Sequence, residues 1–170
     1  MEIMGTIDIG IVMGSDSDLP VMEKAAEILE RFGVTYYMTV ASAHRTPERV
    51  LALAQRAERE NWKVLIAGAG MAAHLAGFLA AHTILPVIGV PMPSSSLGGL
   101  DSLLATVQMP GGIPVASMAI GGAGAKNAAL FAVQILAVSD GSLREKLRQY
   151  RKEERDSIEE QAARVEEAGE

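Results

Sequence analysis

The sequence predicts an α/β fold, a three-layer α/β/α sandwich built on a parallel, doubly wound sheet and followed by a C-terminal tail helix. Apolar runs alternate five times with stretches of helical periodicity over residues 7–138, and each run ends in a polar or glycine-containing loop. No Asp, Glu, Lys or Arg lies between Lys63 and Asp101, which is typical of strands that helices cover on both faces. The simplest arrangement of such units is the flavodoxin-like strand order.

The expected strands are short apolar runs, most of them continuous rather than alternating, as in strands buried on both faces. They cover residues 7–13, 34–40, 64–67, 86–90 and 114–120. An expected helix follows each strand. These helices lie between Ser17 and Gly33 and over residues 47–60, 71–81, 101–108 and 127–138.

Capping residues support the first two helices. Ser17 is a candidate N-cap of the first helix, and Gly33 can end it. Thr46 is a candidate N-cap of the second helix, and Pro47 occupies its first position, where a missing N–H costs nothing.

The length of 170 residues predicts one domain with a modest tail. We expect a catalytic domain over residues 1–139 and an amphipathic helix over residues 140–170, where charged side chains become frequent. Leu143 and Leu147 lie at helical spacing in this tail. The tail helix either lies back on its own domain or reaches a neighbouring subunit, and its sequence pattern fits both.

The composition excludes several classes of protein. The net charge of −6 gives no basic field for binding a nucleic acid. The absence of cysteine excludes disulfides, Cys-ligated metal sites and thiol catalysis. Glycine and proline interrupt the uncharged stretch before it reaches the roughly 20 residues of a membrane span, and the first residues lack a signal-peptide pattern. We therefore expect a cytoplasmic protein with no membrane partner.

The loop after the first strand, GSDSD at residues 14–18, is a candidate phosphate site. Ser15 and Ser17 bring hydroxyls and backbone N–H groups to a helix N-terminus, where the macrodipole favours an anion. The aspartates would repel a bare phosphate, so Asp18 is better suited to ribose hydroxyls. The alternative is that Ser17 only caps the helix and that the aspartates only complement its dipole.

The loop after the second strand contains Ser42, His44 and Arg45. Arg45 can bind a phosphate through two parallel hydrogen bonds, and His44 can exchange a proton near neutral pH. The alternative is that Arg45 pairs with a surface acid and that His44 is structural. Their position at the carboxyl end of a strand, where open α/β sheets bind ligands, favours a functional role.

The loop after the third strand, residues 68–73, matches the pattern G-x-G-x-x-A. It is not the first strand-helix turn, and the next acidic residue, Asp101, lies too far along the chain to hold a ribose, so we reject NAD. The glycines allow the backbone to approach a smaller ligand. His74, in the same turn, is expected either to be structural or to support a residue that contacts the ligand, and His82 is expected to lie on a helix surface.

Phosphate-binding P-loops, zinc-protease motifs and serine-hydrolase elbows do not occur in the sequence. The residues alone therefore indicate a metal-free α/β enzyme that binds a small phosphorylated ligand and moves a proton with one histidine. The loops described above belong to a set of six motifs: GSDSD at 14–18, SAHRTP at 42–47, AGAGMAAHL at 67–75, PVIGVP at 86–91, GLDSLLATVQMPGGIPV at 99–115 and AIGGAGAKNAAL at 119–130.

In these motifs the chain resembles the N(5)-carboxyaminoimidazole ribonucleotide mutase family of de novo purine biosynthesis, the class I catalytic subunit of bacterial phosphoribosylaminoimidazole carboxylase. The resemblance implies a flavodoxin-like fold, no cofactor, and an isomerase that releases a carboxylate as carbon dioxide and attaches it to a ring carbon. It further implies a homo-octamer with active sites between subunits, an intersubunit tail helix, and functional coupling to an ATP-dependent carboxyaminoimidazole ribonucleotide synthetase.

The resemblance also implies roles for individual residues. His44 would shuttle the proton, and Asp18 would bind the ribose hydroxyls. The phosphate would be bound by Ser15, Ser42 and Arg45, with Ser17 also counted among the substrate-binding residues. The base and carbon dioxide pocket would be lined by Ala69, Gly70, His74 and Leu75.

Two residues depart from the usual family pattern, because Met71 replaces a glycine and Ala76 replaces a proline.

Animal-type relatives, which carboxylate aminoimidazole ribonucleotide directly with carbon dioxide, have sequences that resemble SAHK and GRSN in the corresponding loops. Arg45 and the GAG sequence at 68–70 favour the mutase. A non-catalytic nucleotide-binding protein is the alternative of another class.

Overall fold

The computed structural model describes residues 6–94 and 96–169. The chain divides into two compact units, Met1–Val133 and Gln134–Glu170, and each is considered by itself. The first unit contains the sheet and its covering helices, and the second contains the end of one of these helices and the tail helix.

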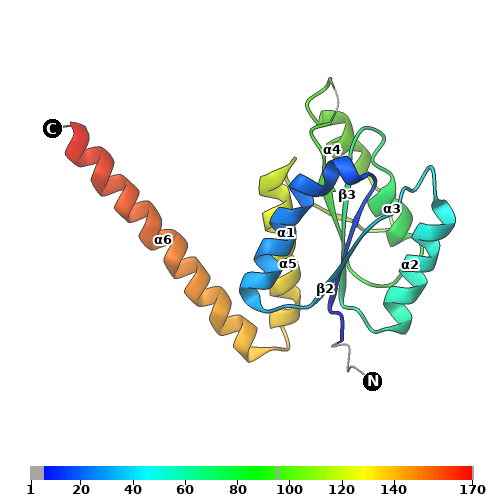
Figure 1. Cartoon of the computed structure of the whole chain (residues 1–170), viewed down its shortest axis with the longest axis horizontal. Helices are drawn as coiled ribbons and strands as arrows, with labels where there is room; N and C mark the ends of the chain where they lie inside the picture. Colours follow the sequence, from blue (N-terminus) through cyan, green and yellow to red (C-terminus); the bar gives the residue numbers. More distant parts are fainter. Residues whose placement is uncertain (1–5, 95, 170) are drawn as a thin grey trace. The chain divides into compact units, whose positions relative to one another are not determined.

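The sheet has five parallel strands in the order β2-β1-β3-β4-β5, which confirms the predicted doubly wound, flavodoxin-like class (Figure 1). The strands are β1 (Ile9–Met13), β2 (Tyr36–Val40), β3 (Val64–Ala69), β4 (Val87–Pro91) and β5 (Ala116–Ser117). The central strands β1 and β4 are buried throughout, as their continuous apolar runs predict.

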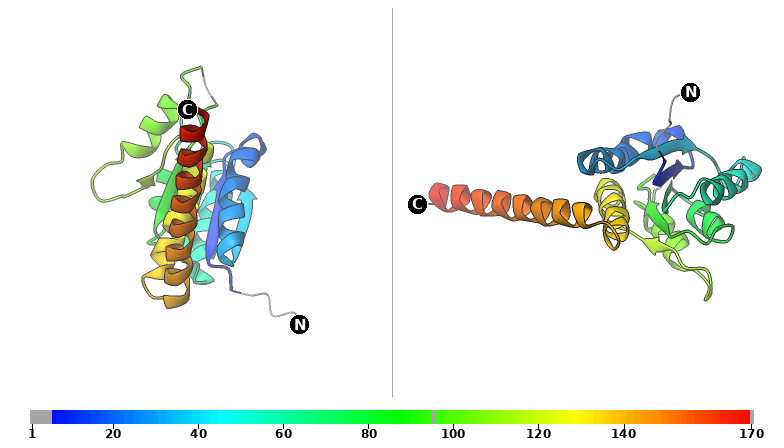
Figure 2. Two further views of the ribbon diagram at one scale, coloured as in Figure 1. Left: turned by 90° about the vertical axis from the view of Figure 1, so that its left-hand side faces the viewer. Right: turned by 90° about the horizontal axis from the view of Figure 1, so that it is seen from below.

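Helices cover both faces of this sheet. They are α1 (Leu19–Phe32), α2 (Pro47–Arg59), α3 (Leu75–Ala80), α4 (Leu100–Val107) and α5 (Gly122–Ala137), and the short 3₁₀ turn η1 (Asp16–Asp18) precedes α1. Helix α1 and the beginning of α5 lie on one face, and α2 and α3 lie on the other (Figures 1 and 2). At Gly89 of β4 an added Cβ would meet Ala76 of α3 and Thr106 of α4, so these two helices share a face.

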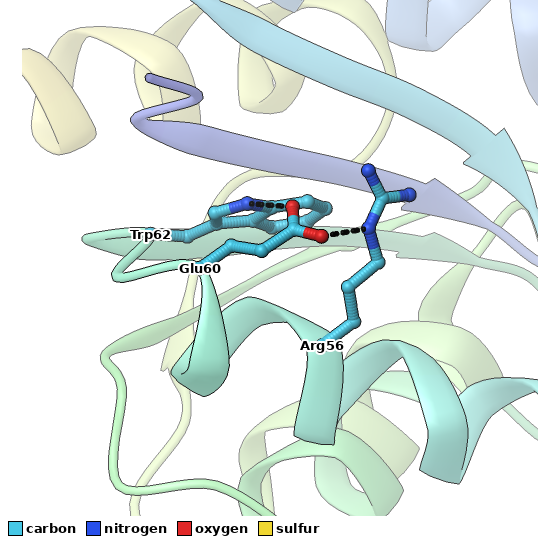
Figure 3. Close-up of polar contacts among 3 residues, drawn as sticks. All are labelled: Arg56, Glu60 and Trp62. Atoms are coloured by element: carbon cyan, nitrogen blue, oxygen red, sulfur yellow. Dashed lines mark hydrogen bonds and ion pairs between the residues drawn. The ribbon is translucent and has the colours of Figure 1, made fainter.

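Trp62 closes the core at the end of the sheet where β3 begins. It is almost fully buried, and its indole N–H donates to Glu60 at 3.1 Å, while Arg56 donates to the same carboxylate at 2.8 Å (Figure 3). The Arg56 guanidinium also lies 4.6 Å from the centre of the Tyr37 ring. These contacts join the end of α2 to the sheet.

Two elements are shorter than the sequence predicts. Helix α3 begins at Leu75 rather than at residue 71, because Met71 adopts a positive φ of 55° that no α-helix contains. Strand β5 has two residues rather than seven, although Met118 N–H still donates to Gly89 across the same edge. Helix α5 begins five residues earlier than predicted, directly after Gly121 with its φ of 75°.

The capping predictions are partly corrected. Gly33 ends α1 in the left-handed conformation, as predicted. Ser17 does not cap the helix, because Ser15 is the N-cap of η1 and accepts a hydrogen bond from the Ser17 N–H. Thr46 occupies the predicted N-cap position of α2, but its hydroxyl accepts from the Ser42 N–H instead of capping the helix.

The second unit contains α6 (Gly141–Gly169), a helix of 29 residues. Asp140 begins it, because its carboxylate accepts from the backbone N–H groups of Ser142 and Leu143. Ion pairs such as Lys152 with Asp156 follow at helical spacing along the exposed surface. Among the described residues, no helix is long and apolar enough to span a membrane.

Candidate functional site

The sheet register brings the predicted site loops together. Met13 of β1 is level with Val40 of β2 and Gly68 of β3, and Ala69 is level with Pro91 of β4. The strands are parallel, so their carboxyl ends form one edge, and a pocket of about 590 Å³ lies there. All ten sequence-predicted site residues line it: Ser15, Ser17, Asp18, Ser42, His44, Arg45, Ala69, Gly70, His74 and Leu75.

The β1–α1 loop contributes a pair of serine hydroxyls. The Ser17 N–H donates to Ser15 Oγ over 3.3 Å, and the Ser17 hydroxyl lies 3.0 Å from the same oxygen. Both hydroxyls precede the 14-residue helix α1, whose first turns leave backbone N–H groups without helical partners. This end of the pocket can therefore bind an anion.

Arg45 links the loops after β1 and β2. Its Nη2 donates to the Gly14 carbonyl at 3.0 Å, and its Nε lies 3.4 Å from the Ser42 hydroxyl. Both partners are neutral oxygen atoms, so they orient the guanidinium without cancelling its charge. Arg45 thus adds a fixed positive charge to the end of the pocket that carries the serines.

Asp18 is the one buried carboxylate of the pocket among the described residues, with 7% of its surface exposed. Burial raises its carboxyl pKa above the ordinary 3.8, although hydrogen bonds from Ser15 and Ser17 act in the opposite direction. The Asp18 carboxylate can accept a hydrogen bond from a ligand in the pocket, and a neutral ligand hydroxyl suits it better than a ligand anion.

His44 and His74 are in direct contact although 30 residues separate them in the sequence. His44 Nε2 lies 2.6 Å from His74 Nδ1, and the two rings meet edge to face with centroids 4.8 Å apart. One nitrogen must donate and the other accept, so one proton lies between the rings and fixes their tautomers relative to each other. His74 is therefore in a position to orient the imidazole of His44.

The β3–α3 loop supplies an apolar wall, and close packing explains its glycines. A Cβ at Gly70 would overlap the Ser94 hydroxyl, and a Cβ at Gly68 would meet the side chains of Met22 and Met92. Close packing against protein side chains therefore requires glycine at both positions, and the predicted approach of a ligand to this backbone stays a prediction.

Sequence reasoning missed several lining residues, among them Met71 and Ser94. Ser94 follows β4, whose loop is at the correct edge of the sheet but carries no charged or titratable group to mark it. A smaller, mostly apolar cavity of about 380 Å³ adjoins the pocket and shares Ala43, His44 and His74 with it. Among the described residues, no three His, Asp or Glu side chains gather at metal-binding distance.

Comparison with known proteins agrees with this geometry. A family model described as AIR carboxylase matches residues 8–157. An N5-carboxyaminoimidazole ribonucleotide mutase of Pyrococcus horikoshii is 58% identical over 161 residues, covering 95% of this chain and 90% of that protein. A mutase of the same name from Thermotoga maritima is 52% identical, covering 95% of this chain and 93% of that protein.

The crystal structure of Treponema denticola PurE superposes with a TM-score of 0.83 at 32% identity, covering 92% of this chain and 96% of that one. The chain belongs to the AIR carboxylase family.

Proposed function

We propose that the protein is a mutase of de novo purine biosynthesis that converts N(5)-carboxyaminoimidazole ribonucleotide to 4-carboxyaminoimidazole ribonucleotide. The observation that carries this proposal is the joining of an anion-binding end, a buried carboxylate and a histidine pair in one pocket. Relatives that are 58% and 52% identical and bear the mutase name support the same reaction.

The pocket residues suggest how the substrate lies. Ser15, Ser42 and Arg45 bind its phosphate at the N-terminal end of α1, with Ser17 beside them. Asp18 accepts hydrogen bonds from the ribose hydroxyls. This orientation directs the imidazole ring away from the serines and toward the histidine pair.

In the reaction, the bond between the exocyclic nitrogen and its carboxylate carbon breaks, and carbon dioxide is released with the electron pair remaining on nitrogen. The ring carbon then attacks the carbon dioxide and loses its own proton. His44 transfers that proton, so that the nitrogen gains the proton that the carbon loses. His74 acts as a positioning residue, because its contact with Nε2 of His44 fixes the tautomer.

The wall formed by Ala69, Gly70 and Leu75 suits the intermediate stage. A pocket that excludes water disfavours the charged carboxylate relative to neutral carbon dioxide and keeps the gas beside the ring. No step in this scheme calls for a cofactor.

The family description also admits direct carboxylation of aminoimidazole ribonucleotide with carbon dioxide. The same pocket could serve that reaction, with His44 removing the ring proton after the carbon–carbon bond has formed. The two activities differ in substrate, so one assay separates them.

The deciding experiment follows 4-carboxyaminoimidazole ribonucleotide formation by purified protein from the N(5)-carboxylated substrate, without ATP or added metal. We expect conversion by the wild type and a loss of about 100-fold or more in kcat for His44→Asn, the usual range for a removed general acid-base. His82→Asn is the matched control, because His82 hydrogen bonds to the Phe78 carbonyl outside the 590 Å³ pocket and should retain activity.

Other outcomes assign a different function. If the wild type uses only aminoimidazole ribonucleotide and carbon dioxide, the protein is the carboxylase. If it binds the nucleotide without converting either substrate, or if His44→Asn is fully active, the proposed enzyme mechanism is wrong.

The same proposal includes the oligomeric state of the protein and its location in the cell. Helix α4 exposes Leu100, Leu104 and Val107 along one side, which suits burial against another copy in a homo-octamer. We assign α6 to contacts between subunits and the reaction to the cytoplasm, where an ATP-dependent synthetase would supply the N(5)-carboxylated substrate.

A further inference from the structure

The walls of the site pocket differ in polarity. The loops after β1 and β2 contribute three of the serine hydroxyls, the carboxylate of Asp18 and the charge of Arg45, and Ser94 after β4 adds a further hydroxyl. The β3–α3 loop contributes the backbone of Gly70 and the apolar side chains of Met71 and Leu75. A ligand with a phosphate at one end and a flat ring at the other matches this division.

Met71 is the large side chain of that apolar wall that remains available to a ligand. Its exposed fraction is 62%, whereas Leu75 is only 2% exposed because it packs into the core. A methionine in this position can adapt its three side-chain torsions to an aromatic ring, and its sulfur makes favourable contacts with ring edges.

The backbone holds Met71 in an unusual conformation. Its φ is 55°, in the left-handed region that glycine adopts readily, asparagine and aspartate occasionally, and other residues rarely. Among the described residues, the one other non-glycine with positive φ is Asn61, at the opposite end of the sheet after α2. A methionine is unfavourable at such a turn, and residues held in this way are frequent at ligand-binding sites.

From these observations we propose that Met71 is a substrate-binding residue that covers the imidazole ring of the bound ribonucleotide. The inference rests on the proposed function, because the phosphate site directs the ring toward the β3–α3 loop. The exposed thioether side chain becomes buried against the ring, and this gain in binding offsets the unfavourable backbone conformation.

Three substitutions separate the side chain from the backbone. Met71→Ala removes the side chain and keeps the left-handed residue, so KM should rise roughly fivefold to tenfold with kcat within about twofold of the wild type. Met71→Leu keeps an apolar side chain of similar volume and should restore KM to within about twofold. Met71→Gly should raise KM as Met71→Ala does and also raise Tm by about 2–4 °C, because glycine adopts positive φ readily.

Asn61→Gly is the matched control. Asn61 also has a positive φ, of 58°, and lies outside the pocket, so glycine replaces a left-handed residue there as it does in Met71→Gly. Asn61→Gly should leave KM and kcat unchanged, whatever its effect on Tm. The mass of each variant in solution, measured by light scattering, shows whether Met71 instead contacts another subunit.

The inference and the proposed function fail in different ways. If the wild type does not convert the substrate, the proposed function is wrong. If the wild type converts it and Met71→Ala keeps the wild-type KM, Met71 does not bind substrate. Two further results would overturn the inference that an apolar side chain at position 71 covers the ring. These are a lower assembled mass for Met71→Ala and a failure of Met71→Leu to restore KM.

Discussion

At the scale of single residues, Asp18 is unfavourable for stability at neutral pH. Burial raises its carboxyl pKa in the folded protein, so the folded state binds its proton more tightly than the unfolded state. The stability contribution of this group is complete below the unfolded value near 3.8 and is lost as pH rises through the higher folded value. Asp18→Asn should therefore raise Tm at pH 7 and have a smaller effect below pH 3.8.

The same substitution should impair binding. An amide oxygen is a weaker acceptor than a carboxylate, so KM should rise by roughly tenfold if Asp18 binds the ribose hydroxyls. Thermal unfolding at pH 7 and at pH 3.5, followed by circular dichroism, tests the first part, and steady-state kinetics test the second. An equal Tm gain at both pH values would contradict the assigned pKa shift.

The sequence allows the site residues to be predicted better than their contacts. Ser15, His44 and Arg45 stand out because each follows a strand-like run and has a side chain suited to phosphate or proton chemistry. The contact between His44 and His74 depends on how two crossovers bring distant loops together, and no spacing rule reveals it. Ser94 has the same difficulty, because a lone serine in a loop has no distinctive pattern.

At the scale of secondary structure, β1 requires a glycine at position 10, because neighbouring side chains leave no room for a Cβ. A Cβ at Gly10 would lie 2.6 Å from both Leu65 Cδ2 and an atom of the Trp62 ring. Gly10→Ala should therefore destabilise the protein by about 1–3 kcal/mol through overpacking, or about 2–12 °C in Tm. Gly111→Ala is the control, because nothing lies within 4 Å of an added Cβ there. A Tm for Gly10→Ala equal to that of the control would show that the core around Trp62 can adjust.

The sequence predicts the existence and order of these elements but not all of their ends. Continuous apolar runs, the helix end at Gly33 and the helix start at Pro47 predict β1 to α2 within a few residues. Helix α3 is predicted too long because alanines at 72 and 73 favour a helix, and helix propensity does not predict the left-handed conformation that Met71 adopts. Strand β5 is predicted too long because an edge strand needs only part of its apolar run for pairing.

At the scale of the whole molecule, the exposed side of α4 is the feature of the sheet domain that most needs a partner. Leu100, Leu104 and Val107 recur at helical spacing and are about half exposed, whereas a helix of an isolated domain normally exposes polar side chains there. The sequence pattern alone does not reveal this, because α4 buries the polar side chains of Ser102 and Thr106 and exposes apolar ones, the reverse of the usual arrangement.

The proposed homo-octamer predicts a solution mass near eight times the 17.9 kDa of one chain. Leu104→Glu should reduce that mass, because a carboxylate buried between copies would lose its hydration without gaining a partner. Activity should fall together with mass if active sites lie between subunits. Ile84→Glu is the matched control, since Ile84 is 93% exposed and precedes β4 rather than belonging to α4. Light scattering combined with kinetics tests this, and a monomeric wild type, or a Leu104→Glu variant that retains the full mass, would show that α4 does not form the subunit contact.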